Sequence, residues 1–258
     1  MSDTPPYLIT AEDLRAIAPE FTPDQAMDQD RIIAELGPCL SGILAEYGLS
    51  SRLRMAHFLA QILHESAGLR TTVEFASGEA YEGRLDIGNT EPGDGVRYKG
   101  RGLIQLTGRR NYRDIGARIG VDLEAEPERA AETVLSLRLA LEYWMSREIN
   151  AMADADDLIA VTRAVNGGLR GLDDRRRLLW RAKCRLAGIV APGTLGPGST
   201  GDAVIALQSA LRDAGATICL DGYFGAATEL AVRQAQARMG QTATGLADAT
   251  LTEALHKT

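Results

Sequence analysis

The sequence predicts a mainly α-helical protein with a large N-terminal domain and a small three-helix C-terminal domain. Apolar residues recur at helical spacing from Met55 to Leu63 and again from Leu135 to Trp144. This periodicity stops in a segment rich in glycine and proline, which indicates a linker. The predicted boundaries are 1–190 for the first domain, 191–200 for the linker and 201–258 for the second domain.

Composition places the chain among ordinary globular proteins. It has 258 residues, of which 45% are hydrophobic and 24% charged. The formal net charge is -7 and no basic patch stands out, so we expect no nucleic-acid partner. No stretch approaches the roughly 20 apolar residues of a membrane span, and the N-terminus lacks the basic and apolar regions of a signal peptide. We therefore expect no membrane span and no export by a signal sequence.

Cysteine and histidine usage argues against a metal centre. The three cysteines and three histidines are scattered along the chain, without the spacing of zinc ligands or of a disulfide framework. We expect buried free thiols, and no metal or other cofactor.

The C-terminal segment has its own helical pattern. Val204, Leu207 and Leu211 share one helical face, a turn is predicted at Asp221–Gly225, and a second helix is expected around residues 230–234. A domain of about 60 residues is near the lower limit for independent folding.

An ordered series of residues in this segment forms a recognisable pattern: Gly201, Asp202, Leu207, Gln208, Asp221 to Gly225, Thr228, Gln236, Thr244 and Gly245. The segment resembles the three-helix peptidoglycan-binding domain that accompanies many cell-wall hydrolases. The similarity extends over residues 198 to 255 and implies bacterial peptidoglycan as the binding partner.

Two glutamates in the large domain suggest acid/base hydrolysis of a sugar bond, which uses a pair of carboxyl groups. Glu65 follows the apolar helix where Gly68 lets the backbone turn, and nearby apolar side chains would favour its protonated form, so it is the candidate acid. Glu74, nine residues later, is the candidate second carboxylate, with Glu79 and Glu82 as alternatives. A separation of roughly 6.5–9.5 Å would leave room for water, whereas about 5 Å would suit a nucleophile.

Polar residues after the glutamates could bind substrate. Gln105 and Thr107 alternate with Ile104 and Leu106, which predicts an extended segment with both polar side chains on one face. Such a pair could hold a water molecule or a sugar hydroxyl. A polar solvent face on an ordinary strand is the equally weighted alternative.

Two further segments complete the candidate site. Residues 78–102 are rich in glycine and have weak periodicity, which predicts a long functional loop or short strands. Asn166 precedes two glycines in a turn that lets the backbone approach a ligand closely. Two of the three arginines at 175–177 are expected on a solvated helix face.

Together these residues resemble the family 19 glycoside hydrolases, the group of chitinases and phage endolysins. The resemblance covers about residues 50 to 188 and implies a lysozyme-like helical fold and an inverting mechanism without metal. It also implies that Glu65 is the acid and Glu74 the base. The matching segments are His64 to Ser66, Gly93 to Gly95, Tyr98 to Gly108, Asn111 with Tyr112, and Val165 to Leu169.

The same resemblance implies roles for other side chains. Arg176 would support the acid through an ionic network, and Asn166 would bind sugar. The full set of implied substrate-binding or supporting residues is Tyr98, Gln105, Thr107, Asn111, Asn166 and Arg176.

The predicted function is that of an endolysin that hydrolyses β-1,4 bonds of peptidoglycan. We expect a monomer that stays in the host cytoplasm until a separate pore releases it to the cell wall. One alternative is a chitinase with the same chemistry on N-acetylglucosamine polymers. Another is a wall-binding protein without activity, although the presence of both glutamates with Gln105 and Thr107 argues against it.

Overall fold

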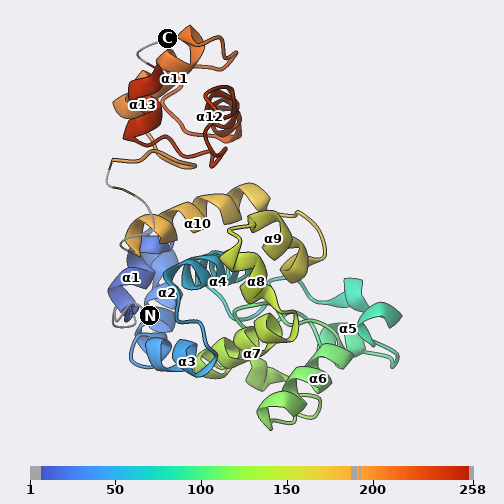
Figure 1. Ribbon diagram of the computed structural model, residues 1–258. Helices are drawn as coiled ribbons and strands as arrows, with labels where there is room; N and C mark the ends of the chain where they lie inside the picture. Colours follow the sequence, from blue (N-terminus) through green and yellow to red (C-terminus); the bar gives the residue numbers. More distant parts are fainter. Residues whose placement is uncertain (1–6, 187–190, 192, 256–258) are drawn as a thin grey trace. The chain divides into compact units, whose positions relative to one another are not determined.

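The structure is a computed structural model that describes residues 7–186, 191 and 193–255 (Figure 1). The chain divides into two compact units, Met1–Leu186 and Ala187–Thr258. The described residues contain thirteen α-helices and three short 3-10 helices, with isolated β-bridges in place of regular strands. The predicted mainly α fold class is therefore confirmed.

Most of the helices belong to the first unit, where the 3-10 helices are labelled η. In chain order they are α1 (Ala11–Ile17), α2 (Pro23–Leu36), α3 (Leu40–Glu46), α4 (Arg52–Glu65), η1 (Glu79–Tyr81), η2 (Leu85–Ile87), α5 (Asp94–Arg97), α6 (Arg109–Ile119), η3 (Pro127–Ala131), α7 (Thr133–Ser146), α8 (Ile149–Asp154), α9 (Leu158–Asn166) and α10 (Leu172–Arg185).

Helix α4 is the central helix of this unit. The hydroxyl of Ser51 caps its first turn by accepting from the amide of Arg54. All residues from Met55 to Leu63 are buried, so the helix is covered on every side, and it packs against α8, α9 and α10. The core helix that the apolar spacing predicted is confirmed.

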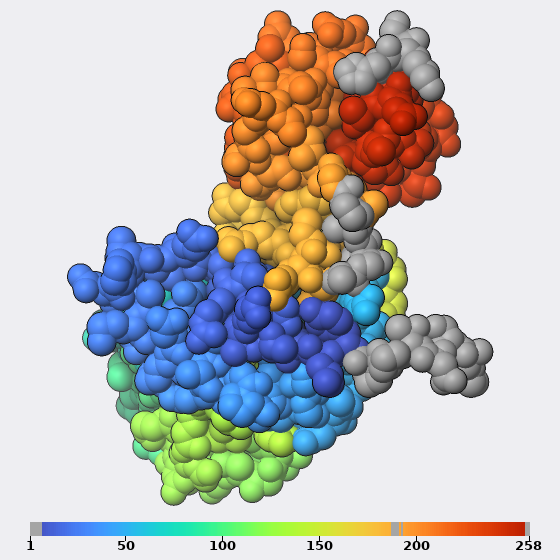
Figure 2. All heavy atoms as spheres, turned by 90° about the vertical axis from the view of Figure 1, so that its left-hand side faces the viewer, coloured from blue at the N-terminus to red at the C-terminus, as the bar shows by residue number. Residues whose placement is uncertain are grey.

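Helix α7 supplies the second predicted apolar stripe. Leu139 and Trp144 are fully buried, and the Trp144 ring meets Phe58 of α4 edge to face with the centroids 5.4 Å apart. Another face of the unit is formed by the N-terminal helices, shown in blue in Figure 2. The ring contact thus joins α7 to the buried middle of α4.

The glycine-rich segment at 78–102, predicted as a long loop or short strands, is a loop with short helical turns. It contains η1, η2 and α5. Val73 pairs with Arg101 in an antiparallel bridge, and Arg101 pairs in turn with Leu106. These bridges place the chain around Glu74 beside Gly100.

The prediction of an extended backbone around Gln105 is wrong. Residues 102–105 form a turn in which the Gln105 amide donates to the Gly102 carbonyl, and Gln105 itself has a left-handed φ of 54°. Ile104 and Leu106 are nevertheless buried while Gln105 is partly exposed, so the alternation of burial was predicted correctly. A turn and a strand can share this pattern over so few residues.

The second unit is a small helical domain formed by α11 (Asp202–Asp213), α12 (Ala226–Arg238) and α13 (Ala249–Leu255). Its core includes Leu207, Leu211 and Phe224. On α12, Leu230 is 56% exposed, and Ala231 and Ala235 lie on the buried face.

Two buried glutamines hold the loops of this unit in the same way. Gln208 accepts from the amide of Gly222 at 3.0 Å and donates to Asp221 at 2.7 Å. Gln236 accepts from the amide of Gly245 at 2.9 Å and donates to the hydroxyl of Thr244 at 2.9 Å. The glutamines that carry the family resemblance therefore have a structural function as loop clamps.

Other expectations concern the thiols and the membrane. Cys39, Cys184 and Cys219 are free, but Cys39 is half-buried and the other two are exposed, so the expectation of buried thiols is wrong. In the part of the chain that the structure describes, we find no helix with the length and hydropathy of a membrane span.

Candidate active site

Glu65 is the last residue of α4 and is held where the helix ends. Ala67, Gly68 and Leu69 all have a left-handed φ, which turns the chain sharply away from the helix axis. The Ser66 hydroxyl donates to the Ile62 carbonyl at 2.6 Å and accepts from the Leu69 amide at 3.0 Å. The Glu65 side chain, 19% exposed, is therefore fixed at its base and open to solvent at one side.

The arginine that contacts Glu65 is Arg175. Its guanidinium is fully buried and donates through Nη2 to Oε1 of Glu65. The expected partner, Arg176, instead pairs with Asp173 at 2.6 Å. The structure thus shows Arg175 on the acid, and the supporting role that the resemblance implies for Arg176 stays a prediction.

A hydrogen bond between His64 and Asp174 also ties α4 to α10 next to Glu65. Nδ1 of His64 lies 2.7 Å from Oδ2 of Asp174, and this hydrogen bond is the main reason that the pKa of Asp174 falls to about 2. Gly171 packs directly against the His64 ring, where a Cβ atom would clash. The last turn of α4 and the first turn of α10 therefore hold each other in place.

Glu74 lies in a partly buried position and receives two hydrogen bonds. The Tyr81 hydroxyl donates to Oε1 at 2.8 Å, and the Gly100 amide donates to Oε2 at 2.9 Å. Burial and the bond to Glu74 raise the pKa of Tyr81 to about 12, so its hydroxyl stays a proton-bearing donor at neutral pH. Both oxygen atoms of Glu74 are thereby oriented.

The alternative glutamates have different surroundings. Glu79 is exposed on η1. Glu82 accepts from the backbone amides of Gly93 at 2.7 Å and Gly95 at 2.8 Å, so it clamps the loop before α5. Of the three, Glu74 has the environment best suited to an oriented base.

Gln105 joins Glu74 beside Gly100. A Cβ atom added to Gly100 would lie 2.7 Å from Oε1 of Gln105 and 3.0 Å from Oε2 of Glu74. The Thr107 hydroxyl donates to the Gln105 carbonyl at 2.8 Å, and the Asn111 side chain donates to the Thr107 carbonyl at 2.7 Å. The structure thus connects Gln105, Thr107 and Asn111 with Glu74.

The last two predicted site residues have other hydrogen-bond partners. Asn166 ends α9 and is exposed, with its amide 3.3 Å from the Arg170 carbonyl. Tyr98 is only 1% exposed, and its hydroxyl donates to the carbonyl of Glu124 at 3.0 Å. The structure therefore corrects the expectation for Tyr98, whose ring packs edge to face on Tyr112 as part of the core.

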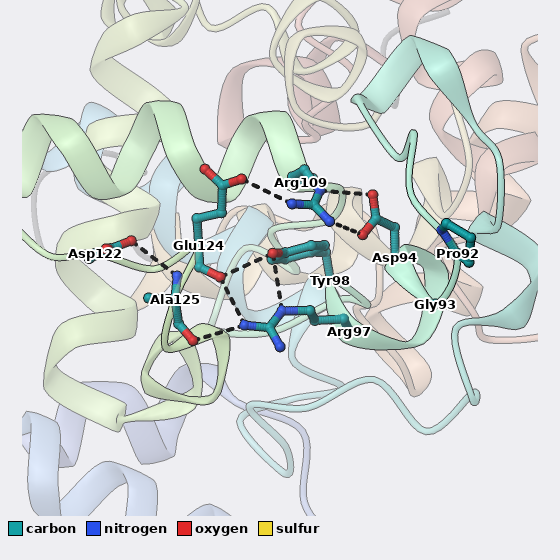
Figure 3. Close-up of a pocket in the computed structure, with 9 residues that line it drawn as sticks. All are labelled: Pro92, Gly93, Asp94, Arg97, Tyr98, Arg109, Asp122, Glu124 and Ala125. Carbon is teal, nitrogen blue, oxygen red and sulfur yellow. Dashed lines mark hydrogen bonds and ion pairs between the residues drawn. The ribbon is translucent and has the colours of Figure 1, made fainter.

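A cavity of about 600 Å³ lies elsewhere on this unit (Figure 3). It contains neither Glu65 nor Glu74. Arg109 crosses it between Asp94 and Glu124, and the Arg97 guanidinium donates to the carbonyls of Glu124 and Ala125. Its polar groups are engaged with each other, so it is a structural ion-pair network and not the site of the glutamates. Over residues 7–186, 191 and 193–255, no cluster of three or more potential metal ligands occurs.

Two residues of the site were missed in the sequence. Tyr81 lies in a loop without periodicity, so no pattern connects it with Glu74. Arg175 had a detectable signal, because it falls on the buried face of α10 with Leu178, Leu179 and Ala182.

Comparison with known proteins identifies two matching families in the chain. The family model described as chitinase class I matches residues 48–162, and the model of a putative peptidoglycan binding domain matches residues 200–255. A "glycosyl hydrolase family 19 domain-containing protein" of Haemophilus influenzae is 31% identical over 170 residues, covering 54% of this chain and 83% of the relative. Acidic endochitinase Q of Nicotiana tabacum is 33% identical over 110 residues, covering 42% of this chain and 41% of its own.

Solved structures show the same fold. Chitinase C from Streptomyces griseus has a TM-score of 0.52 at 19% identity, covering 72% of this chain and 95% of its own. A bacterial family 19 chitinase has a TM-score of 0.51 at 21% identity, covering 76% of this chain and 99% of its own. The chain belongs to glycoside hydrolase family 19 and carries a peptidoglycan-binding domain at its C-terminal end.

Proposed function

We propose that this glycoside hydrolase cleaves the β-1,4 bonds of peptidoglycan, with Glu65 as general acid and Glu74 as general base. The observation that carries the assignment is the contrast between the two carboxyl groups. Glu65 is fixed at a helix end and partly open to solvent, and Glu74 is oriented by Tyr81 and Gly100. In glycoside hydrolysis the acid must carry a proton while the base must be ionised, so the two carboxyl groups need different environments.

In this mechanism Glu65 protonates the oxygen atom of the leaving sugar while Glu74 accepts a proton from water. Oε2 of Glu74 and Oε1 of Gln105 both border Gly100. Two acceptor oxygens can bind the two hydrogen atoms of one water molecule, which leaves an oxygen lone pair for attack on the anomeric carbon. We infer that this water attacks from the face opposite the leaving group, so that the configuration is inverted.

The peptidoglycan-binding domain favours bacterial cell wall as the substrate. A domain that binds peptidoglycan raises the local concentration of the wall around a tethered hydrolase. We infer that the protein is an endolysin, a monomer that accumulates in the cytoplasm of the host and reaches the wall when a separate pore opens. Chitin is the second candidate, because acidic endochitinase Q and other plant relatives are named as chitinases.

The experiment is the digestion of purified peptidoglycan, with chitin oligomers in parallel. Mass spectrometry of borohydride-reduced products identifies the sugar at each new reducing end, which reports both the substrate and the bond. Proton NMR of the first products should show the α-anomer if configuration is inverted. Cleavage of chitin alone would replace peptidoglycan with chitin, and binding without cleavage would indicate a wall-binding protein without activity.

Variants of the glutamates test the assignment of roles. Glu65→Gln and Glu74→Gln should each lower kcat by at least about 10²-fold, the contribution typical of one general acid or base. Glu79→Gln is the matched control, since Glu79 is an exposed glutamate of the same loop. If Glu79→Gln or Glu82→Gln abolished activity in a folded protein while Glu74→Gln did not, the assignment of the base would be wrong.

Lysis of living cells tests the endolysin role. Bacteria that express the protein should stay intact until a membrane pore is co-expressed and should then lyse. Lysis without the pore would contradict retention in the cytoplasm. Removal of residues 195 to 258 should weaken activity on intact walls and spare soluble fragments.

A further inference from the structure

A buried glutamine, Gln61, lies one helical turn before Glu65 on α4. It is fully buried, and its Oε1 accepts a hydrogen bond from Nη1 of Arg175. Because a guanidinium group only donates hydrogen bonds, the amide oxygen of Gln61 must face it. Among the described residues, Nε2 of Gln61 has no hydrogen-bond partner. The contact with Arg175 is thus the interaction that compensates for burying this amide group.

The three nitrogen atoms of Arg175 are divided among three acceptors. Nε donates to the Arg170 carbonyl at 3.2 Å, Nη1 to Gln61 and Nη2 to Oε1 of Glu65. A two-point arginine–carboxylate pair needs two of these nitrogen atoms on one carboxylate. The Arg170 carbonyl binds Nε and Gln61 binds Nη1, so neither nitrogen atom joins Nη2 on Glu65.

We propose that Gln61 is a positioning residue that restricts Arg175 to a one-point contact with Glu65. The inference rests on the proposed role of Glu65 as the acid. A two-point pair with arginine would favour the charged carboxylate, whereas a proton donor must carry its proton when substrate binds. With Nη1 engaged by Gln61, Oε2 of Glu65 stays free of Arg175 and available to hold the transferable proton.

Other charged and titratable groups face this assembly from the elements packed around it. His64 and Asp174 form the adjacent pair, and burial with the charge of Glu65 raises the pKa of Tyr143 on α7. At the far end of the α4–α10 contact, His57 and Lys183 both bind Asp156. Gln61→Met changes none of these charged groups, so a change in the titration of Glu65 in that variant reports on Arg175.

Two replacements of similar shape should act in opposite directions. Gln61→Met removes the acceptor, which frees Nη1 to join Nη2 on Glu65, so the alkaline limb of the kcat/KM profile should move to lower pH by about one unit. Gln61→Glu introduces a charged acceptor that draws Arg175 away and adds a like charge, so the limb should move to higher pH by a similar amount. Thr162→Val is the control, because it removes a buried hydroxyl from α9 without touching Arg175.

Carboxyl-carbon NMR of the same variants follows the protonation of Glu65 without substrate, with Glu65→Gln to assign the signal. Opposite shifts in the two Gln61 variants, and none in Thr162→Val, are expected. A purely packing role for Gln61 would lower the melting temperature and leave both the limb and the NMR midpoint unchanged, which would overturn the proposal. If Gln61→Met fails to fold, an unchanged midpoint of the Glu65 NMR titration in the near-isosteric Gln61→Glu would likewise overturn the proposal. NMR shifts in an enzyme without hydrolase activity would refute the proposed function and leave the positioning role intact.

Discussion

The hydroxyl group of Tyr81 donates a 2.8 Å hydrogen bond to Oε1 of Glu74. Hydrogen bonds donated to a carboxylate favour its charged form. In Tyr81→Phe, Glu74 should therefore take up a proton at higher pH. The acidic limb of the pH profile of kcat/KM should move to higher pH by about one unit. Tyr47→Phe is the control, because the Tyr47 hydroxyl binds Glu142 away from the site. An acidic limb that moved equally in both variants would contradict a specific role for Tyr81.

Gly100 sets the spacing between the base and Gln105. Gly100→Ala should displace Glu74 or Gln105, since the new methyl group would lie within 3.0 Å of both side chains. A misplaced water or base costs about 10²-fold in kcat. Gly42→Ala, on α3 with open space around it, should leave kcat unchanged. The two variants are compared by steady-state kinetics and melting temperature, and normal kcat in Gly100→Ala would mean that the spacing is not critical.

Glu124 links electrostatics to stability at low pH. Hydrogen bonds from Arg113 and Arg109 lower its pKa from 4.5 to about 2. Because the folded pKa is the lower one, the ion pairs stabilise the protein above about pH 4.5, and this stabilisation is lost as the pH falls toward 2. Glu124→Gln should thus melt below the wild type at pH 7, with the difference shrinking by pH 2.5. Glu128→Gln, at an exposed glutamate, should show no such pH-dependent difference.

The two glutamine clamps of the C-terminal unit should contribute similarly to its stability. Gln208→Ala and Gln236→Ala each leave the amide of a loop glycine without its acceptor, at a cost of about 1–3 kcal/mol. Calorimetry should show a lower transition for this unit, and binding to purified cell walls should weaken in parallel. The exposed Gln234 on α12 offers a matched control in Gln234→Ala. Stable clamp variants that lost wall binding would instead assign these glutamines to the ligand.

Periodicity predicted the core of this protein better than its site. The apolar spacing from Met55 to Leu63 predicted a helix correctly, and the structure buries every side of that segment. Arg175 was not singled out because three consecutive arginines conceal the helical register, although Arg175 aligns with the buried Leu178 and Leu179. Three-residue regularities, such as those around Gln105, do not distinguish a turn from a strand.

The remaining site residues depend on contacts between distant segments. Tyr81 reaches Glu74 only because short helical turns fold the loop back, and no local pattern encodes that return. Tyr98 belongs to a segment that resembles a substrate-binding motif, yet its ring completes the core against Tyr112. Aromatic residues serve both purposes, and sequence alone does not separate them.

The continuous burial of α4 has a consequence for how the enzyme responds to heat. Amides within Met55–Leu63 should exchange with solvent only when the whole unit unfolds, whereas residues 75–97, which are mostly exposed, should exchange through local opening. The proposed acid, Glu65, thus lies at the end of the helix that should unfold last. The proposed base, Glu74, directly precedes a segment that should unfold early. On warming, local opening of residues 75–97 should make the enzyme lose turnover reversibly below its melting temperature, while α4 still holds Glu65 in its native position.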